Sequence, residues 1–438
     1  MTHHFDLQLT LCPENVPAAF RQYGGEIWAQ GQAQLVNHEA VALKQLSFLL
    51  YRLLRVNQIT DRAGHPLPFS QTLVTLDEVP RMTVNHVQIL LGAPLAPGET
   101  VCINIEYGGP ICGYPEVFPY VQDHISEEYT LLRAETLWLP TVCEPGSFSL
   151  PPFTYHLSIQ YPNNSSCYCN GQQRSIAQGS CEWERTQPED WGRLIVACAP
   201  FVHLPIHDQV VLHVLPQDSS RVQPIVQALR FTLQCCTNWF GKLPVEDVHI
   251  VEMPAGYGME SADTLMIFEA EAFAPARTEH EAFLHALSLI GHELIHLWNA
   301  PSREVHNTRF LDESITHYIE ALVIREMFGE EEYRRRMNDF RKTFLAGGEA
   351  ANHVSLSNSW EHYNMTVPLS RGKGPWLMAA LHKQLGTSFL PALQAFFDRC
   401  RESGATPEDF QHMMQEYSPQ PLQAFFQQWY YQPGPIRS

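Results

Sequence analysis

Residues 278–296 read TEHEAFLHALSLIGHELIH, and this stretch decides how the second half of the chain folds. Thr278 and Glu281 have the spacing of a capping box, which marks a helix N-terminus. Apolar residues then recur at helical spacing and predict one long helix with a buried face. The stretch closes on the HELIH sequence of residues 292–296. Its two histidines are four positions apart, so they project from one face of the helix and can hold a single metal ion.

A hydrolytic zinc site needs three protein ligands and one position open to water. Besides His292 and His296, Glu313 is the best third candidate. It lies 17 positions beyond His296, at the start of a helix predicted from about residue 312 to residue 328 and ended by Gly329. Glu293 is placed to act on a water molecule at the metal rather than on the metal itself. The composition predicts roughly 0.1 chance matches to this histidine spacing, so a chance helix match is a minority reading.

Glu313 also has a simpler interpretation, because a carboxylate at a helix N-terminus is stabilised by about 0.3–1 kcal/mol without any metal. Two other glutamates compare poorly as ligands. Glu304 follows His296 too closely, and Glu320 lies two turns beyond Glu313, roughly 10 Å along the helix axis. Asp312 can orient a ligand or cap the helix.

The first two hundred residues have the patterns of strands. Apolar and polar residues alternate over 101–107 and 155–161, a further apolar run covers 194–198, and proline and glycine punctuate the segments. After about residue 205 the spacing becomes helical, first over 222–233 with Asp218 or Ser219 as the expected cap. The expected fold class is therefore α+β, with an antiparallel β-sheet domain over 1–204 and a mainly helical domain with a small sheet over 205–438.

Composition narrows the class of protein. Hydrophobic residues make up 45% of the chain and charged residues 17%, as in globular proteins. The formal net charge of −19 argues against nucleic acid or an anionic membrane as a partner. No apolar run approaches the ~20 residues needed to span a bilayer, and the first residues lack the pattern of a secretory signal. Eleven cysteines without metal-type spacing favour reduced thiols, so we expect a cytoplasmic protein.

The metal-binding segment resembles the aminopeptidase N family of gluzincin metallopeptidases. In that family, H-E-x-x-H on one helix is followed by a glutamate in an N-E-G-F-A-like motif on the next. This chain has the sequence DESIT at residues 312–316 in place of that motif, after a loop two residues shorter than usual. The resemblance implies one Zn²⁺ per chain, with His292, His296 and Glu313 as its ligands and Glu293 as the general base. It also implies that the glutamate at the Glu320 position lies deeper in the site.

A second motif points to the substrate. Residues 258–261, GMES, resemble the family's G-x-M-E-N loop, whose glutamate binds the free α-amine of the substrate. The resemblance implies this role for Glu260, which would recognise a protonated amine by a charge-assisted hydrogen bond. Taken alone, Glu260 reads as a surface or loop glutamate. Weaker similarity around residues 138–145 and 429–435 extends the resemblance over almost the whole chain, as a saddle-like sheet domain followed by a thermolysin-like catalytic domain.

One position departs from the family. The family places a tyrosine two residues before a Lys-Gly pair, and its hydroxyl stabilises the oxyanion. Arg371 occupies that position here, and Tyr363 lies eight residues earlier. Either side chain can be the donor, and the sequence does not choose between them. Loss of an oxyanion donor costs roughly 10²–10³ in turnover.

We therefore expect a zinc-dependent aminopeptidase that acts on peptides with a free N-terminus. Two alternatives stay open: a gluzincin endopeptidase, and a weakly active or inactive binding protein with the same fold. The sequence does not predict the side-chain preference or the oligomeric state. Of the remaining histidines, His285 is expected to pack or to form a hydrogen bond, and the others are interpreted as solvated or capping residues: His280, His306 and His317.

Overall fold

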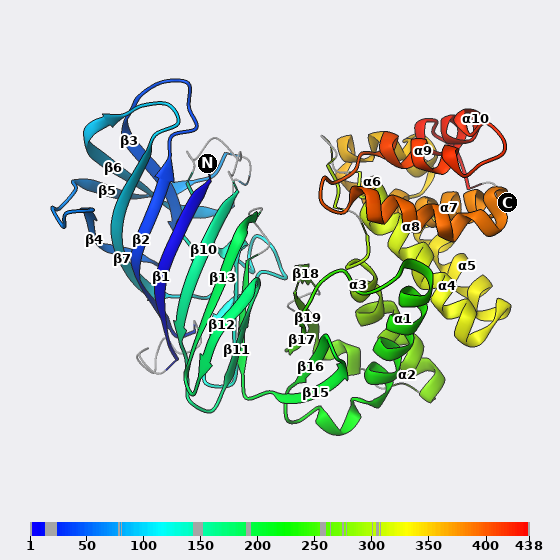
Figure 1. Cartoon of the computed structure of the whole chain (residues 1–438), viewed down its shortest axis with the longest axis horizontal. Coiled ribbons are helices and arrows are strands. Elements are labelled where there is room, and N and C mark those ends of the chain that lie inside the picture. The colour runs from blue at the N-terminus through cyan, green and yellow to red at the C-terminus, as the bar shows by residue number, and fades with distance from the viewer. Residues whose placement is uncertain are drawn as a thin grey trace. The chain divides into compact units, whose positions relative to one another are not determined.

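The computed structural model describes residues 2–13, 24–77, 79, 81–142, 152–189, 194–254, 260–262, 264–273, 276, 278–299, 301–303, 306 and 308–436. The chain forms two compact units (Figure 1). One comprises residues 1–220 and 247–271, and the other comprises residues 221–246 and 272–438. The predicted domain boundary near residue 205 lies within strand β15 (Val202–His207), and it stays a prediction.

The largest sheet of the first unit has seven strands in the order β12-β13-β10-β1-β2-β7-β4. Alternation of apolar and polar residues gives it one buried and one exposed face. In β1 (His3–Cys12), for example, Phe5, Leu7 and Leu9 are buried. Most neighbours are antiparallel, but β1 pairs in parallel with β10 (Phe153–Gln160). The other strands are β2 (Glu26–Val36), β4 (Arg55–Asp61), β7 (Thr100–Pro110), β12 (Gln172–Ala177) and β13 (Ser180–Glu189).

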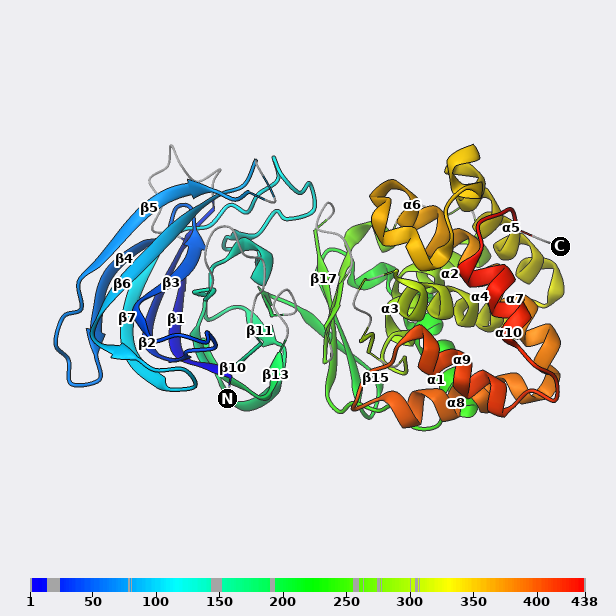
Figure 2. The same cartoon turned by 90° about the horizontal axis from the view of Figure 1, so that it is seen from above.

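Two smaller sheets share the hydrophobic core of the first unit. A three-stranded sheet has the order β3-β6-β5, and both views place it beside β4 and β7 (Figures 1 and 2). A four-stranded sheet has the order β11-β14-β9-β8. Their strands are β3 (Leu43–Tyr51), β5 (Phe69–Thr75), β6 (Thr83–Leu95), β8 (His124–Ile125), β9 (Thr130–Arg133), β11 (Ser166–Cys169) and β14 (Ile195–Ala199).

A five-stranded sheet follows, in the order β15-β16-β17-β19-β18. The strands β16 (Val210–Val214), β17 (Val248–Met253) and β19 (Leu265–Glu269) are parallel, and β15 and β18 (Glu260–Ala262) are antiparallel to their neighbours. The sequence predicted a small sheet within the domain over 205–438, and these strands fall in the first compact unit. Glu260 is the first residue of β18 and pairs with Ile267 of β19.

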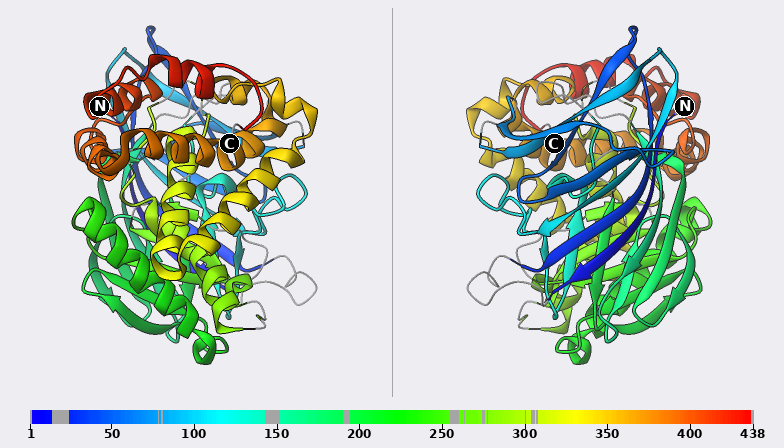
Figure 3. Two further views of the ribbon diagram at one scale, coloured as in Figure 1. Left: turned by 90° about the vertical axis from the view of Figure 1, so that its right-hand side faces the viewer. Right: turned by 90° about the vertical axis from the view of Figure 1, so that its left-hand side faces the viewer.

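The second unit is mainly helical, and Figure 3 shows its helices in green to red. Helix α2 begins after Thr278, whose side chain accepts a hydrogen bond from the backbone N–H of Glu281, so the predicted cap is confirmed. The predicted cap of α1 is wrong: Val222 is the N-cap residue, and residues 219–221 form a separate 3₁₀ turn. Proline in the first turn of α1 fixes a helical φ and needs no partner for its nitrogen. The helices are α1 (Gln223–Phe240), α2 (Glu279–Ala286), α3 (His292–Ile295), α4 (Ile315–Phe328), α5 (Glu330–Ala346), α6 (Tyr363–Val367), α7 (Gly374–Leu385), α8 (Phe389–Cys400), α9 (Pro407–Glu416) and α10 (Gln423–Phe426).

The described part of the second unit contains four π-helical turns, and the last of them, Gln427–Tyr431, follows α10. The other three lead into helices and cover Leu287–Gly291 before α3, Phe310–Ser314 before α4 and Pro368–Lys373 before α7. Each turn contains or directly precedes a residue singled out by the sequence. A π turn takes up one extra residue and rotates everything that follows it about the helix axis, which is why such turns recur at functional sites. The sequence predicted a single uninterrupted helix through residues 278–296, so the first of these turns is a correction.

Helix α7 crosses the start of α4 at very short range. A Cβ added to Gly374 would lie 1.9 Å from the Ser314 hydroxyl oxygen, so only glycine fits at this crossing. The same hydroxyl donates a hydrogen bond to the backbone carbonyl of Ser370 at 2.6 Å. The π turn that carries Arg371 is therefore fixed against the π turn that carries Glu313.

Candidate metal centre

The two histidines of the HELIH sequence converge on one point, as their spacing predicts. The Nε2 atoms of His292 and His296 lie 3.2 Å apart. The Glu313 carboxylate completes the group, with its Oε2 atom 3.4 Å from His292 Nε2. His292 and Glu313 are buried, and His296 is partly exposed.

These residues fit a zinc ion. With zinc–ligand distances of about 2.0–2.1 Å, the ligand atoms of a tetrahedral site lie about 3.3 Å from each other. The separations of 3.2 and 3.4 Å match this spacing. Glu313 Oε2 is also buried without a hydrogen-bond partner among the residues that the structure describes. A bare carboxylate oxygen facing an imidazole nitrogen in a buried site is the arrangement that a cation satisfies.

The other oxygen of the Glu313 carboxylate is held by two arginines. Glu313 Oε1 accepts hydrogen bonds from Nη2 of Arg309 at 2.5 Å and from Nη2 of Arg371 at 2.8 Å. Burial disfavours the charged form of Glu313, but the neighbouring His292 imidazole and the charge of Arg371 hold its pKa well below the ordinary value. The carboxylate is therefore ionised, with Oε2 left as the oxygen available to a metal.

A second carboxylate fixes His292 from behind. Glu320 is fully buried, and its Oε2 atom accepts a hydrogen bond from Nδ1 of His292 at 3.3 Å. Arg336 lies against the same carboxylate, with its Nε atom 2.8 Å from Glu320 Oε1. A proton held on Nδ1 leaves the lone pair of His292 on Nε2, where a metal ligand needs it. The deeper position that the resemblance implied for Glu320 agrees with these contacts.

Small polar residues hold His296 and the loop beyond it. His296 Nδ1 lies 3.3 Å from the Thr316 hydroxyl. The Asn299 side-chain amide donates to the Leu311 carbonyl at 2.6 Å and reaches the Thr316 hydroxyl at 3.3 Å. Asp312 is not the N-cap residue, which is Arg309; its Oδ1 atom accepts from the backbone N–H of Glu313 at 2.7 Å, and its Oδ2 atom accepts from Nε of Arg309 at 2.6 Å. These bonds tie the HELIH helix to the helix that carries Glu313.

One histidine was interpreted wrongly from the sequence. His317 is neither solvated nor a cap: its ring is buried beside that of His292, with the ring centroids 4.2 Å apart, and its Nδ1 atom lies 3.2 Å from Glu320 Oε2. The available signal was its spacing, because His317 lies four residues after Glu313 and shares its helix face. His280 and His306 are both exposed, as expected, and the His306 ring stacks on Trp360 with the centroids 3.6 Å apart.

The remaining predicted residues are not brought together with the metal ligands by any described contact. Glu293 is half-buried beside His292 on α3 and contributes to the electrostatic environment of His292. Glu260 belongs to the first compact unit, and its side chain lies outside the described part of the chain, as do Gly258 and Met259. Tyr363 begins α6, and its side chain also lies outside the described part.

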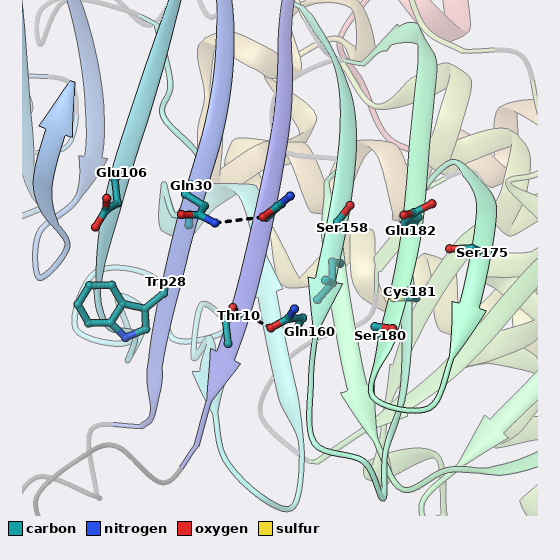
Figure 4. Close-up of a pocket in the computed structure, with 13 residues that line it drawn as sticks. Thr10, Trp28, Gln30, Glu106, Ser158, Gln160, Ser175, Ser180, Cys181 and Glu182 are labelled. Atoms are coloured by element: carbon teal, nitrogen blue, oxygen red, sulfur yellow. Dashed lines mark hydrogen bonds between the residues drawn. The ribbon is translucent and has the colours of Figure 1, made fainter. Parts of the chain in front are cut away.

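A broad depression occupies the exposed face of the seven-stranded sheet in the first unit (Figure 4). Its lining is polar, with Gln30, Glu106, Ser158 and Gln160 among the residues that point into it. Gln30 donates a hydrogen bond to Gln8 on the neighbouring strand at 3.1 Å. Among the described residues, the groups that could hold a metal ion all lie in the second unit instead.

The fold and the donor set together define a zinc metallopeptidase, which uses one catalytic Zn²⁺. Residues 232–429 match the profile of the Peptidase family M1 domain. A search of curated protein sequences gives no match. In the part of the chain that the structure describes, no helix is long and apolar enough to cross a membrane.

Solved structures confirm the predicted fold class. The M1 zinc metallopeptidase from Deinococcus radiodurans is 15% identical with a TM-score of 0.65, and the match covers 100% of this chain and 96% of that one. Native yeast LTA4 hydrolase is 16% identical with a TM-score of 0.67, over 100% of this chain and 69% of that one. A mutant of the D. radiodurans enzyme bound to a Tyr-Ser-Ala substrate is 16% identical with a TM-score of 0.63, over 100% of this chain and 94% of that one. Identities this low show a shared fold.

Proposed function

We propose that the protein is an aminopeptidase that removes the N-terminal residue of peptides, with Zn²⁺ held by His292, His296 and Glu313. The observation that carries this proposal is the buried Glu313 Oε2 atom, which lies without a hydrogen-bond partner in the described part of the chain, opposite the His292 Nε2 atom. When bound, zinc polarises a scissile carbonyl and lowers the pKa of a water molecule towards ~7. The Tyr-Ser-Ala complex of the D. radiodurans enzyme supports a peptide as the class of substrate.

Glu293 is the proposed general base. It is one residue from His292 on α3 and half-buried, so it can face the site while water still reaches it. In this role the Glu293 carboxylate takes a proton from the attacking water and delivers it to the leaving amine. Glu320 and Thr316 hold the two imidazoles in fixed orientations, so Glu293 does not have to position them.

Glu260 is the proposed partner of the α-amine of the substrate. What supports this role is the GMES motif together with the position of Glu260 at the start of a sheet-edge strand. A carboxylate there would pair with a protonated amine and restrict cleavage to the first peptide bond.

Arg371 is the proposed donor to the oxyanion in place of the family tyrosine. One of its nitrogens holds Glu313 Oε1, and nearly half of its side chain is exposed. An arginine carries five N–H donors, so the contact with Glu313 leaves others free to face a substrate. The position of Arg371 beside a proposed metal ligand supports it over Tyr363 for this role.

The test compares the wild-type chain with Glu293→Gln, which keeps the size of the side chain and removes the base. We expect one zinc ion in each protein, and a loss of roughly 10²–10⁴ in turnover on amino-acid amides and short peptides for the variant. Full activity in Glu293→Gln would refute the assigned base. Equal cleavage of peptides with a free and an acetylated N-terminus would indicate an endopeptidase. One zinc ion without turnover on any peptide would indicate a binding protein.

A further inference from the structure

His317 offers a metal ion a coordination position that the proposed zinc site does not use. We propose that a metal held by His292 and Glu313 can take His317 as its other histidine in place of His296. This inference rests on the proposed zinc ligands and adds a fourth protein residue to them.

The spacing around Glu313 is the first argument. The Nε2 atom of His317 lies 3.4 Å from Glu313 Oε2, the same distance that separates His292 Nε2 from that oxygen. Both distances match the ligand spacing of about 3.3 Å in a tetrahedral zinc site. Glu313 Oε2 therefore lies at a ligand–ligand separation from each of two imidazole nitrogens.

The hydrogen bonds of Glu320 are the second argument. Its Oε2 atom lies 3.3 Å from His292 Nδ1 and 3.2 Å from His317 Nδ1. Arg336 stands 2.8 Å from the other oxygen, which keeps the Glu320 carboxylate ionised and able only to accept. When a metal is bound, each imidazole would therefore keep its proton on Nδ1 and offer the lone pair of Nε2 to the metal. Glu320 prepares His317 as a ligand in the same way that it prepares His292.

Burial without a partner is the third argument. His317 Nε2 and Glu313 Oε2 are both buried, and neither has a hydrogen-bond partner among the described residues. Two acceptors that face each other across 3.4 Å in a buried site repel, unless a cation or a proton lies between them. On the outer side the His317 ring packs against Phe340, with the centroids 5.2 Å apart, so the nitrogen is directed towards Glu313 rather than towards solvent.

The consequence is a site that tolerates the loss of His296. In a site with only three protein ligands, His296→Ala leaves two and the metal is lost. Here His292, Glu313 and His317 still provide three. Of the two alternative ligands, His317 is buried whereas His296 is partly exposed.

The experiment measures Zn²⁺ affinity by competition with a chromophoric chelator, and the visible spectrum with Co²⁺ in place of Zn²⁺. It uses the full chain as wild type, His296→Ala, His317→Asn and the double variant. The asparagine amide in His317→Asn would keep a donor near the Nδ1 position for Glu320 while removing the nitrogen that faces Glu313. We expect His317→Asn to bind within about threefold of wild type, because His296 still completes a three-ligand site. We expect His296→Ala to retain one metal ion with a loss of up to about 100-fold, and the double variant to lose at least another 100-fold.

The cobalt spectrum gives a second readout. His296→Ala should keep ligand-field bands at shifted wavelengths, and adding His317→Asn should abolish them. If His296→Ala loses the metal as completely as the double variant does, His317 is not a ligand and the inference is overturned. Zinc binding that stays at wild-type affinity in the double variant, where only His292 and Glu313 are left, would instead refute the proposed zinc site itself. Thermal unfolding of the metal-free proteins shows whether each variant is folded.

Discussion

Glu320→Gln tests whether the buried carboxylate behind the metal site organises it. Glu320 is fully buried and contacts His292, His317 and Arg336. Glutamine keeps the shape of the side chain but removes its charge. It has one acceptor oxygen for three donors, and its amide nitrogen would face one of them.

The expected cost follows from these contacts. Breaking a buried ion pair by removing one partner costs about 3–5 kcal/mol. The Arg336 side chain is 23% exposed, so its guanidinium regains some hydration and the lower end of the range, about 3 kcal/mol, applies. In a unit of this size each kcal/mol lowers Tm by about 2–4 °C, which gives a decrease of about 6–12 °C in the metal-free protein. Zinc affinity should fall about 10- to 100-fold, because His292 loses the partner that fixes its tautomer.

The assay is thermal unfolding in the presence of a chelator, followed by a zinc titration. Glu331→Gln is the matched control: Glu331 is 79% exposed and forms an ion pair with Arg335 on α5, so its loss should cost no more than about 0.5 kcal/mol.

The surroundings of Glu320 hold its pKa well below the ordinary 4.5. The stability that Glu320 contributes is therefore fully present above pH 4.5 and is lost as the pH falls further. The difference between wild type and Glu320→Gln should shrink in the same range. If Glu320→Gln unfolds at the same temperature as Glu331→Gln at neutral pH and binds zinc with wild-type affinity, the carboxylate does not organise the site.

Two further predictions concern the same centre. Burial lowers the pKa of His292, but the neighbouring carboxylates of Glu313 and Glu320 outweigh burial and raise the pKa to about 9 in the metal-free protein. At pH 7 zinc must therefore displace about one proton from the site, and zinc affinity should rise with pH until about pH 9. Proton release on zinc binding can be measured with an indicator dye, and the absence of release would contradict the prediction. Arg371→Met should lower turnover roughly 10²–10³-fold while zinc affinity changes less than about tenfold, because Arg309 still holds Glu313 Oε1. Arg309→Met is the matched control, and equal losses of turnover in the two variants would show that Arg371 acts only through Glu313.

The part of the site that the sequence predicts is the part set by spacing within one helix. His292 and His296 converge because they are four residues apart, and Glu313 follows from its place at the start of the next helix. Strand alternation predicted the α+β fold in the same way. These predictions use only the spacing of residues within a single helix or strand, and that spacing can be read directly from the sequence.

What the sequence does not predict depends on contacts between elements. The π turns before α3, α4 and α7 each take up one residue that a helical period cannot reveal. The crossing at Gly374 is recognisable only once Ser314 is known to face it. The role of His317 cannot be inferred from its position in the sequence, because it depends on the contacts of the ring with Glu320 and His292.

The arginine at position 371 changes more than the oxyanion donor. Compared with the family motif that the sequence resembles, Arg371 stands where a tyrosine hydroxyl is expected. In the structure, its guanidinium lies 2.8 Å from Oε1 of the proposed metal ligand Glu313, which Arg309 also holds. Two cations on one oxygen draw charge away from the other, so a metal at Oε2 would keep more of its own positive charge and polarise a carbonyl more strongly. The same guanidiniums weaken the ligand, and His317, as the proposed alternative ligand, would offset that loss. We therefore interpret Arg371 and His317 together, as two parts of one metal environment.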